Sequence, residues 1–63
     1  MRLSKEFISD MRSKSAEGIF QAIRQLVRDE FGVVERDELK EALDDAVEAG
    51  LLEEREIRRL EDN

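Results

Sequence analysis

The chain has 63 residues, enough for one small domain over residues 1–63. It contains no cysteine and no histidine, which excludes disulfide cross-links and Cys/His zinc sites as sources of stability. Large apolar residues number 20 although 44% of the chain is charged, a balance typical of folded proteins. Because a domain this short buries only about 60% of its unfolded surface, oligomerisation or unusually efficient helix packing must supply further stability.

The apolar residues are too scattered for a membrane segment. The longest runs of large apolar residues are pairs, whereas a span needs about 18 consecutive residues. The first residues alternate polar and apolar without the continuous apolar region of a signal peptide. We therefore expect a cytoplasmic protein that makes no membrane contact.

The net charge of −6 is unevenly distributed along the chain. Residues 1–28 hold six basic and three acidic side chains, a net charge of +3, whereas residues 29–63 hold five basic and 14 acidic, a net charge of −9. The two halves attract each other, either within one chain or across an antiparallel dimer.

The first predicted helix covers residues 4–12. Ser4 is a suitable N-cap, and Phe7, Ile8 and Met11 share one face. The polar stretch at 12–15 either ends this helix or lies on the surface of one long helix over 4–31. We favour two helices, because Ser15 precedes Ala16 as a cap should.

The central segment shows the clearest helical periodicity and ends at Gly32, which can adopt the left-handed conformation that closes a helix. Gly18 lies close to the apolar stripe and is expected to let another helix approach. The stripe recurs at three- and four-residue steps through Ala16, Ile19, Phe20, Ile23, Leu26, Val27 and Phe31.

The C-terminal half predicts a helical hairpin. Leu39, Leu43 and Val47 belong to a second apolar stripe that ends before Gly50. A last helix over about 53–61 follows, with Ile57 and Leu60 directed inward. The sequence therefore predicts an all-α fold of three to four short helices. The Gly50 turn is similar to the helix–glycine–helix hairpins of small bacterial oligomerisation modules, a resemblance that identifies no family.

The residue types argue against an enzyme. Without His, Cys or Thr the usual nucleophile–base pairs cannot form, and adjacent acids such as Asp44 and Asp45 diverge on a helix. No EF-hand loop, Glu-x-x-His pair or glycine-rich phosphate loop is present, so we expect no metal and no cofactor.

We therefore predict a non-catalytic protein–protein interaction module, an adaptor, regulator or inhibitor subunit that binds itself as a homodimer and a second protein. Large apolar side chains on helix faces dominate such interfaces. The residues expected to form this interface are Phe7, Met11, Phe20, Ile23, Val27 and Phe31.

Two alternatives remain. The acidic C-terminal half is able to mimic nucleic acid and occupy a basic groove of another protein. A helix-turn-helix regulator would place residues 53–61 in DNA, but Glu53, Glu54 and Glu56 would be repelled by phosphates. Arg12, Lys14, Arg24 and Arg28 offer a weaker nucleic-acid surface, without Tyr or Trp for stacking. Nucleic acid is not an expected partner.

Overall fold

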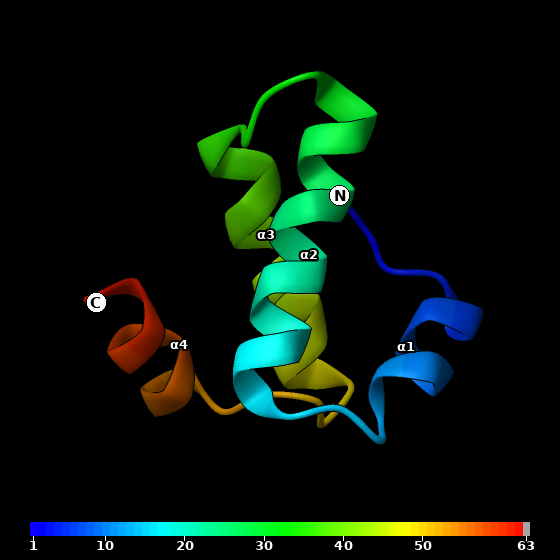
Figure 1. Ribbon diagram of the computed structural model, residues 1–63, viewed down its shortest axis with the longest axis vertical. Helices are drawn as coiled ribbons and strands as arrows, with labels where there is room; N and C mark the ends of the chain where they lie inside the picture. Colours follow the sequence, from blue (N-terminus) through cyan, green and yellow to red (C-terminus); the bar gives the residue numbers. More distant parts are fainter. Residues whose placement is uncertain (63) are drawn as a thin grey trace.

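The computed structural model describes residues 1–62, which form four α-helices and no strand (Figure 1). This confirms the all-α class and the predicted number of helices. The helix α2 lies at the centre and packs against both α3 and α4 (Figure 1). The helices are α1 (Lys5–Met11), α2 (Ala16–Phe31), α3 (Arg36–Glu48) and α4 (Glu54–Glu61).

Side-chain caps explain where the helices begin. The Ser4 Oγ accepts a hydrogen bond from the Phe7 amide at 3.1 Å, and the Ser15 Oγ accepts one from the Gly18 amide at 3.1 Å. Each bond satisfies an amide that the first helical turn leaves free. Residues 4–31 therefore form two helices, as predicted, because Ser15 starts a new one.

The acidic half uses glutamate for the same purpose. The Glu35 Oε2 accepts from the Glu38 amide at 2.8 Å, so Glu35 caps α3 although glutamate ranks below serine or aspartate at this position. At α4, Glu53 and Glu56 form a reciprocal capping box. These carboxylates also lie at the positive ends of the helix dipoles, which stabilises them there.

Two glycines end helices as predicted. Gly32 closes α2 with a φ of 82°, and Gly50 follows α3 with a φ of 81°, both left-handed. The expectation for Gly18 is wrong. A β-carbon there would meet only Ser15 and Lys14 of the preceding turn, so no other helix approaches this glycine.

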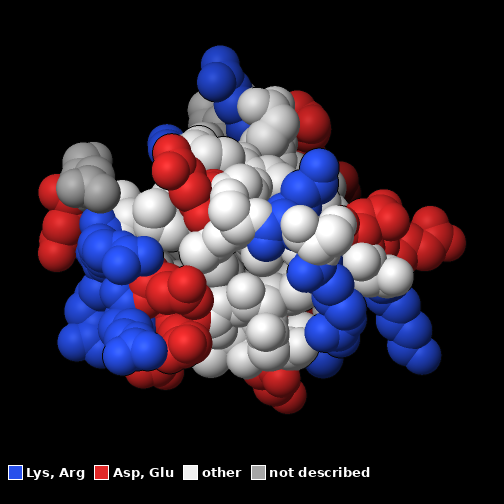
Figure 2. All heavy atoms as spheres, turned by 60° about the horizontal axis from the view of Figure 1, so that its bottom comes forward, with Lys and Arg blue, Asp and Glu red and all other residues white. Residues whose placement is uncertain are grey.

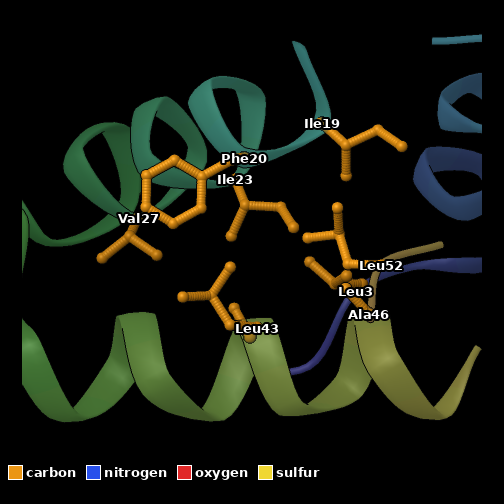
Figure 3. Close-up of a cluster of buried hydrophobic side chains, with 9 residues drawn as sticks. Leu3, Ile19, Phe20, Ile23, Val27, Leu43, Ala46 and Leu52 are labelled. Atoms are coloured by element: carbon orange, nitrogen blue, oxygen red, sulfur yellow. The ribbon is translucent and has the colours of Figure 1, made fainter. Parts of the chain in front are cut away.

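The core lies mainly between α2 and α3. Figure 3 shows the side chains of α2 directed at Leu43 and Ala46 of α3, with Leu3 and Leu52 at one end of the cluster. Two small residues, Ala42 and Ala46, lie four apart on α3 and are fully buried, which leaves room for the larger side chains of α2. The buried residues of α2 are Ile19, Phe20, Ile23 and Val27.

The N-terminal segment is fastened along α3. The Met1 amine lies 2.6 Å from a Glu38 carboxylate oxygen and 2.8 Å from one of Glu41. The Leu3 amide donates to the Asp45 carboxylate at 2.8 Å, and the Leu3 side chain is buried. Burial disfavours the charged amine, but the bonds to Glu38 and Glu41 outweigh this and raise the pKa of Met1 above its ordinary value of 8.0.

Candidate protein-docking groove

The six residues predicted to form an interface lie in three different environments. Phe20, Ile23 and Val27 are buried in the chain's own core, with Ile23 and Val27 at 0% exposure. Ile23 and Val27 are therefore not accessible to a partner, whereas Phe20, which is 4% exposed, also lines a hollow together with Leu39 and Leu60. Phe7 and Met11 of α1 are half-buried against the same core.

Phe31 is the exposed member of this set. It is 45% exposed, and Val33 in the following turn is 62% exposed. Both lie outside the core cluster, at the connection between α2 and α3. Exposed apolar surface therefore lies at the C-terminal end of the α2 stripe and in the turn that follows it.

A larger apolar concavity lies between α3 and α4, which we name the α3–α4 groove. Its first part, about 290 Å³, has an apolar floor of Leu39, Leu43 and Ile57. A second part of about 280 Å³ shares Leu39 and Glu61 with it and is also lined by Leu60, Val34 and two residues of α2, Phe20 and Arg24. Leu39, Ile57 and Leu60 are only partly buried, so the floor presents apolar surface to solvent.

The groove exists because α3 and α4 each pack mainly on α2 and not on each other. The turn that joins them is a Schellman motif: the Gly50 amide donates to the Val47 carbonyl at 3.0 Å, and the Leu51 amide donates to the Ala46 carbonyl at 2.9 Å. Leu52 then enters the core with 3% exposure. This anchor sets where α4 begins and holds it away from α3.

Charged side chains of both signs form the rim of the groove. Arg36, Asp37 and Lys40 stand on the α3 wall, and Glu61 stands on the α4 wall. Lys40 pairs with Asp44 on its own helix at 3.1 Å. Arg36 and Glu61 form no ion pair within the described part of the chain. An apolar centre with a mixed polar rim is the usual anatomy of a protein–protein interface.

Apart from Phe20, the groove residues differ from the predicted interface. Leu39, Leu43, Ile57 and Leu60 were expected to be core residues, and Leu43 is one, with 4% exposure. Helical periodicity identifies the apolar side of each helix, but it does not tell whether the neighbouring helix comes close enough to cover it. One feature of the sequence does point to the groove. Arg36 and Glu61 lie at helix ends where the dipole disfavours their charge.

The exposed face of α2 is a second, more polar surface. Arg24 and Arg28 line a shallow hollow of about 160 Å³ with two glutamines and Val34. Neither arginine is ion-paired to another described residue. Two arginines without a stacking aromatic ring make a small basic surface on a chain of net charge −6.

The helix α4 does not present a continuous basic surface. Figure 2 shows acidic side chains directly beside the Lys and Arg side chains on the left, where α4 lies. Arg55 pairs with Glu53 at 3.1 Å, and Glu53, Glu54 and Glu61 are exposed. A recognition helix with these carboxylates would meet phosphate repulsion along most of its length.

Two kinds of feature are absent from residues 1–62. No group of three or more acidic side chains is placed to hold a metal ion, and no helix is both long enough and apolar enough to cross a bilayer. Comparison with known protein families, curated proteins and solved structures gives no match.

Proposed function

We propose that this protein is a non-catalytic protein–protein interaction module, a cytoplasmic adaptor, regulator or inhibitor subunit that docks onto another chain, its own copy included. The observation that carries the proposal is the α3–α4 groove, whose floor of Leu39, Ile57 and Leu60 stays partly exposed. A partner side chain or helix placed there would remove this apolar surface from water, at about 25 cal/mol for each Å².

In this proposal α3 and α4 act together as a helical hairpin. The two helices are the walls of the groove, and the Schellman turn at Gly50 fixes their separation before a partner arrives. A preformed groove loses little conformational entropy on binding. The groove, and not the buried stripe of α2, is therefore the surface through which the module acts.

The exposed area of the chain agrees with an unfilled groove. A compact monomer of 7.4 kDa exposes about 4,200 Å², whereas this chain exposes 4626 Å². The radius of gyration, 10.5 Å, matches the roughly 10.6 Å of a compact chain of this length, so elongation does not explain the excess. The excess exposed area therefore comes from indentations of the surface and from long charged side chains.

The acidic nucleic-acid mimic is the second candidate, and the exposed side of α3 favours it. Glu41, Asp44 and Glu48 line a shallow hollow there together with Asp45 and Arg2. Part of this charge is already used inside the chain, since Glu41 pairs with the Met1 amine and Asp44 with Lys40. On the rim of the α3–α4 groove only Lys40 is used in this way, while Arg36 and Glu61 are not, so the groove is the better supported site.

The proposal is tested by photo-crosslinking from the two surfaces in cells that produce the protein. A photoreactive amino acid at position 40 lies on the groove rim, and one at position 25 lies on the exposed face of α2 as a matched control. We expect defined protein adducts from position 40 and few from position 25. Each adduct partner is then purified and the complex reconstituted.

In the reconstituted complex, Leu39→Ala should weaken binding by about tenfold, because it removes part of the groove floor. Gln25→Ala should leave the affinity unchanged. Equal adducts from both positions, or a complex that is indifferent to Leu39→Ala, would show that the groove is not the docking surface.

A further inference from the structure

We infer that the occupant of the α3–α4 groove is a second copy of this chain, related by a two-fold axis that places Glu61 of each copy against Arg36 and Lys40 of the other. The inference rests on the proposed function, that the groove is a docking surface. It goes further by naming the partner and the register in which it binds.

The charges on the groove rim are self-complementary. In a two-fold dimer the same patch meets itself, so each contact between two different residues occurs twice. The α3 wall carries Arg36 and Lys40 with one acid, Asp37, whereas the α4 wall carries Glu61. A two-fold rotation that brings the α4 wall of one copy to the α3 wall of the other therefore joins opposite charges in both places.

Arg36 and Glu61 have no comparable use inside one chain. Arg36 is the first residue of α3, and Glu61 is the last residue of α4. The positive end of a helix dipole disfavours an arginine and the negative end disfavours a glutamate. Both side chains are exposed, and neither forms an ion pair with a described residue. A neighbouring copy would supply the opposite charge that each lacks.

A different self-association is possible in principle, between Arg24 and Arg28 of one copy and the acidic side of α3 in another. The hollows that these residues line have no residue in common. A closed dimer would need both hollows on one face of the chain, and otherwise the copies would join head to tail into rings or open filaments. The groove, by contrast, carries the basic and the acidic residues on its own two walls.

The size of the chain suits such a dimer. A standard interface buries about 800 Å² on each partner, which is roughly a sixth of the 4626 Å² that this chain exposes. The groove floor and rim from Val34 through Leu39 to Ile57, with the adjoining walls of α3 and α4, form the continuous surface on which this burial would occur.

The test is a charge-reversal cycle followed by sedimentation equilibrium. We expect the unaltered chain to dimerise at micromolar concentration, and Arg36→Glu and Glu61→Arg each to raise the dimer dissociation constant by at least about tenfold, because each reversal places like charges together twice. The double variant Arg36→Glu/Glu61→Arg should return to within about threefold of the parent.

Two features of the cycle separate the contact from a net-charge effect. The single reversals change the net charge in opposite directions, from −6 to −8 and from −6 to −4, so general repulsion would weaken one dimer and strengthen the other. Arg28→Glu also gives −8 but lies outside the groove, and it should leave the dissociation constant unchanged. Circular dichroism of each variant verifies that the helices persist.

The outcomes that overturn the inference are distinct. A parent chain of monomer mass at high micromolar concentration excludes the second copy as occupant, while a reconstituted complex with another protein would still support the docking function. A dimer that tolerates both reversals uses another surface. A dimer weakened by both reversals but not restored in the double variant has another register, and one weakened equally by Arg28→Glu is held by net charge or by the exposed face of α2.

Discussion

The helix α3 has two apolar sides, one sealed by α2 and the other left open toward α4. On the sealed side, Ala42 and Ala46 are fully buried beneath Ile23 and Val27 of α2. On the open side, Leu39 is only partly buried, and so are the side chains that α4 directs at the groove. Apolar residues of one helix therefore serve folding on one side and are available for binding on the other. The closeness of the neighbouring helix makes the difference.

The largest loss of stability is expected from Ile23→Asp, which alters the sealed side of α3. Ile23 is 0% exposed in the α2–α3 core, and a carboxylate there would have no partner and no water. We expect the free energy of unfolding to fall by about 4 kcal/mol or more, enough to unfold a domain of marginal stability. Urea denaturation followed by circular dichroism measures the loss.

The matched control is Gln21→Asp, which introduces the same charge on the exposed face of the same helix. It should cost about 1 kcal/mol or less, since only helix propensity changes. Similar losses in the two variants would mean that Ile23 is not sealed by α3 and that the contrast between the two sides is wrong.

The turn at Gly50 determines where α4 begins, and so it determines that the second apolar side of α3 stays open. A β-carbon at this position would meet nothing within 4 Å, so Gly50→Val tests the backbone alone. The φ of 81° should cost valine about 1 to 2 kcal/mol. Gly50→Asn should cost less, since asparagine enters the left-handed region more readily. Thermal unfolding measures both, and equal losses would assign the cost to something other than backbone conformation.

The sealed side of the molecule was predictable from the sequence because its determinants are local. Ser15 as a cap, Gly32 as a terminator and the helical periodicity through Ile23 all act within a few residues of themselves, and the structure confirms the helix that they predict. Glutamate ranks low as a helix cap, but the Glu35 carboxylate still accepts a hydrogen bond from the Glu38 amide.

The open side was not predictable for the complementary reason. Phe20 and Val27 show the same periodicity whether the stripe faces a neighbouring helix or a partner protein, so the sequence could not tell that α3 covers them. The groove depends on how α4 leaves the turn at Gly50, and that follows from the burial of Leu52. The separation of α3 and α4 cannot be predicted from the sequence of α3 alone.

A smaller effect concerns how residues 1–3 are fastened to α3. The pKa of the Met1 amine is raised by Glu38 and Glu41 despite its partial burial, so the folded chain binds this proton more tightly than the unfolded chain. The resulting stabilisation is fully present below pH 8 and is lost as the pH rises through the raised value. We expect the midpoint of urea unfolding to fall between pH 7 and about 10.

Acetylation of the Met1 amine removes the titrating group and provides the control for this pH dependence. The acetylated chain should be less stable at pH 7 and should lose less stability toward high pH, because the ion pairs with Glu38 and Glu41 are already absent. Identical pH profiles with and without acetylation would mean that these ion pairs do not stabilise the folded chain.

The smallest effect on stability is expected from Arg24→Ala/Arg28→Ala, which sharpens the comparison by altering the exposed face of α2 and none of the apolar residues on either side of α3. Both side chains are exposed and form no ion pair with a described residue, so the free energy of unfolding should change by about 0.5 kcal/mol or less. Binding through the groove should largely persist, because Arg28 does not line it and Arg24 adds only a charged side chain to its second part, not an apolar one. If the protein instead binds nucleic acid with this face, the variant should lose affinity, and the salt dependence of binding should become shallower as phosphate contacts disappear. Retention on immobilised DNA over a salt series distinguishes the two. A folded double variant that keeps its dimer but loses a DNA complex formed by the parent would place the function on α2 and not in the groove.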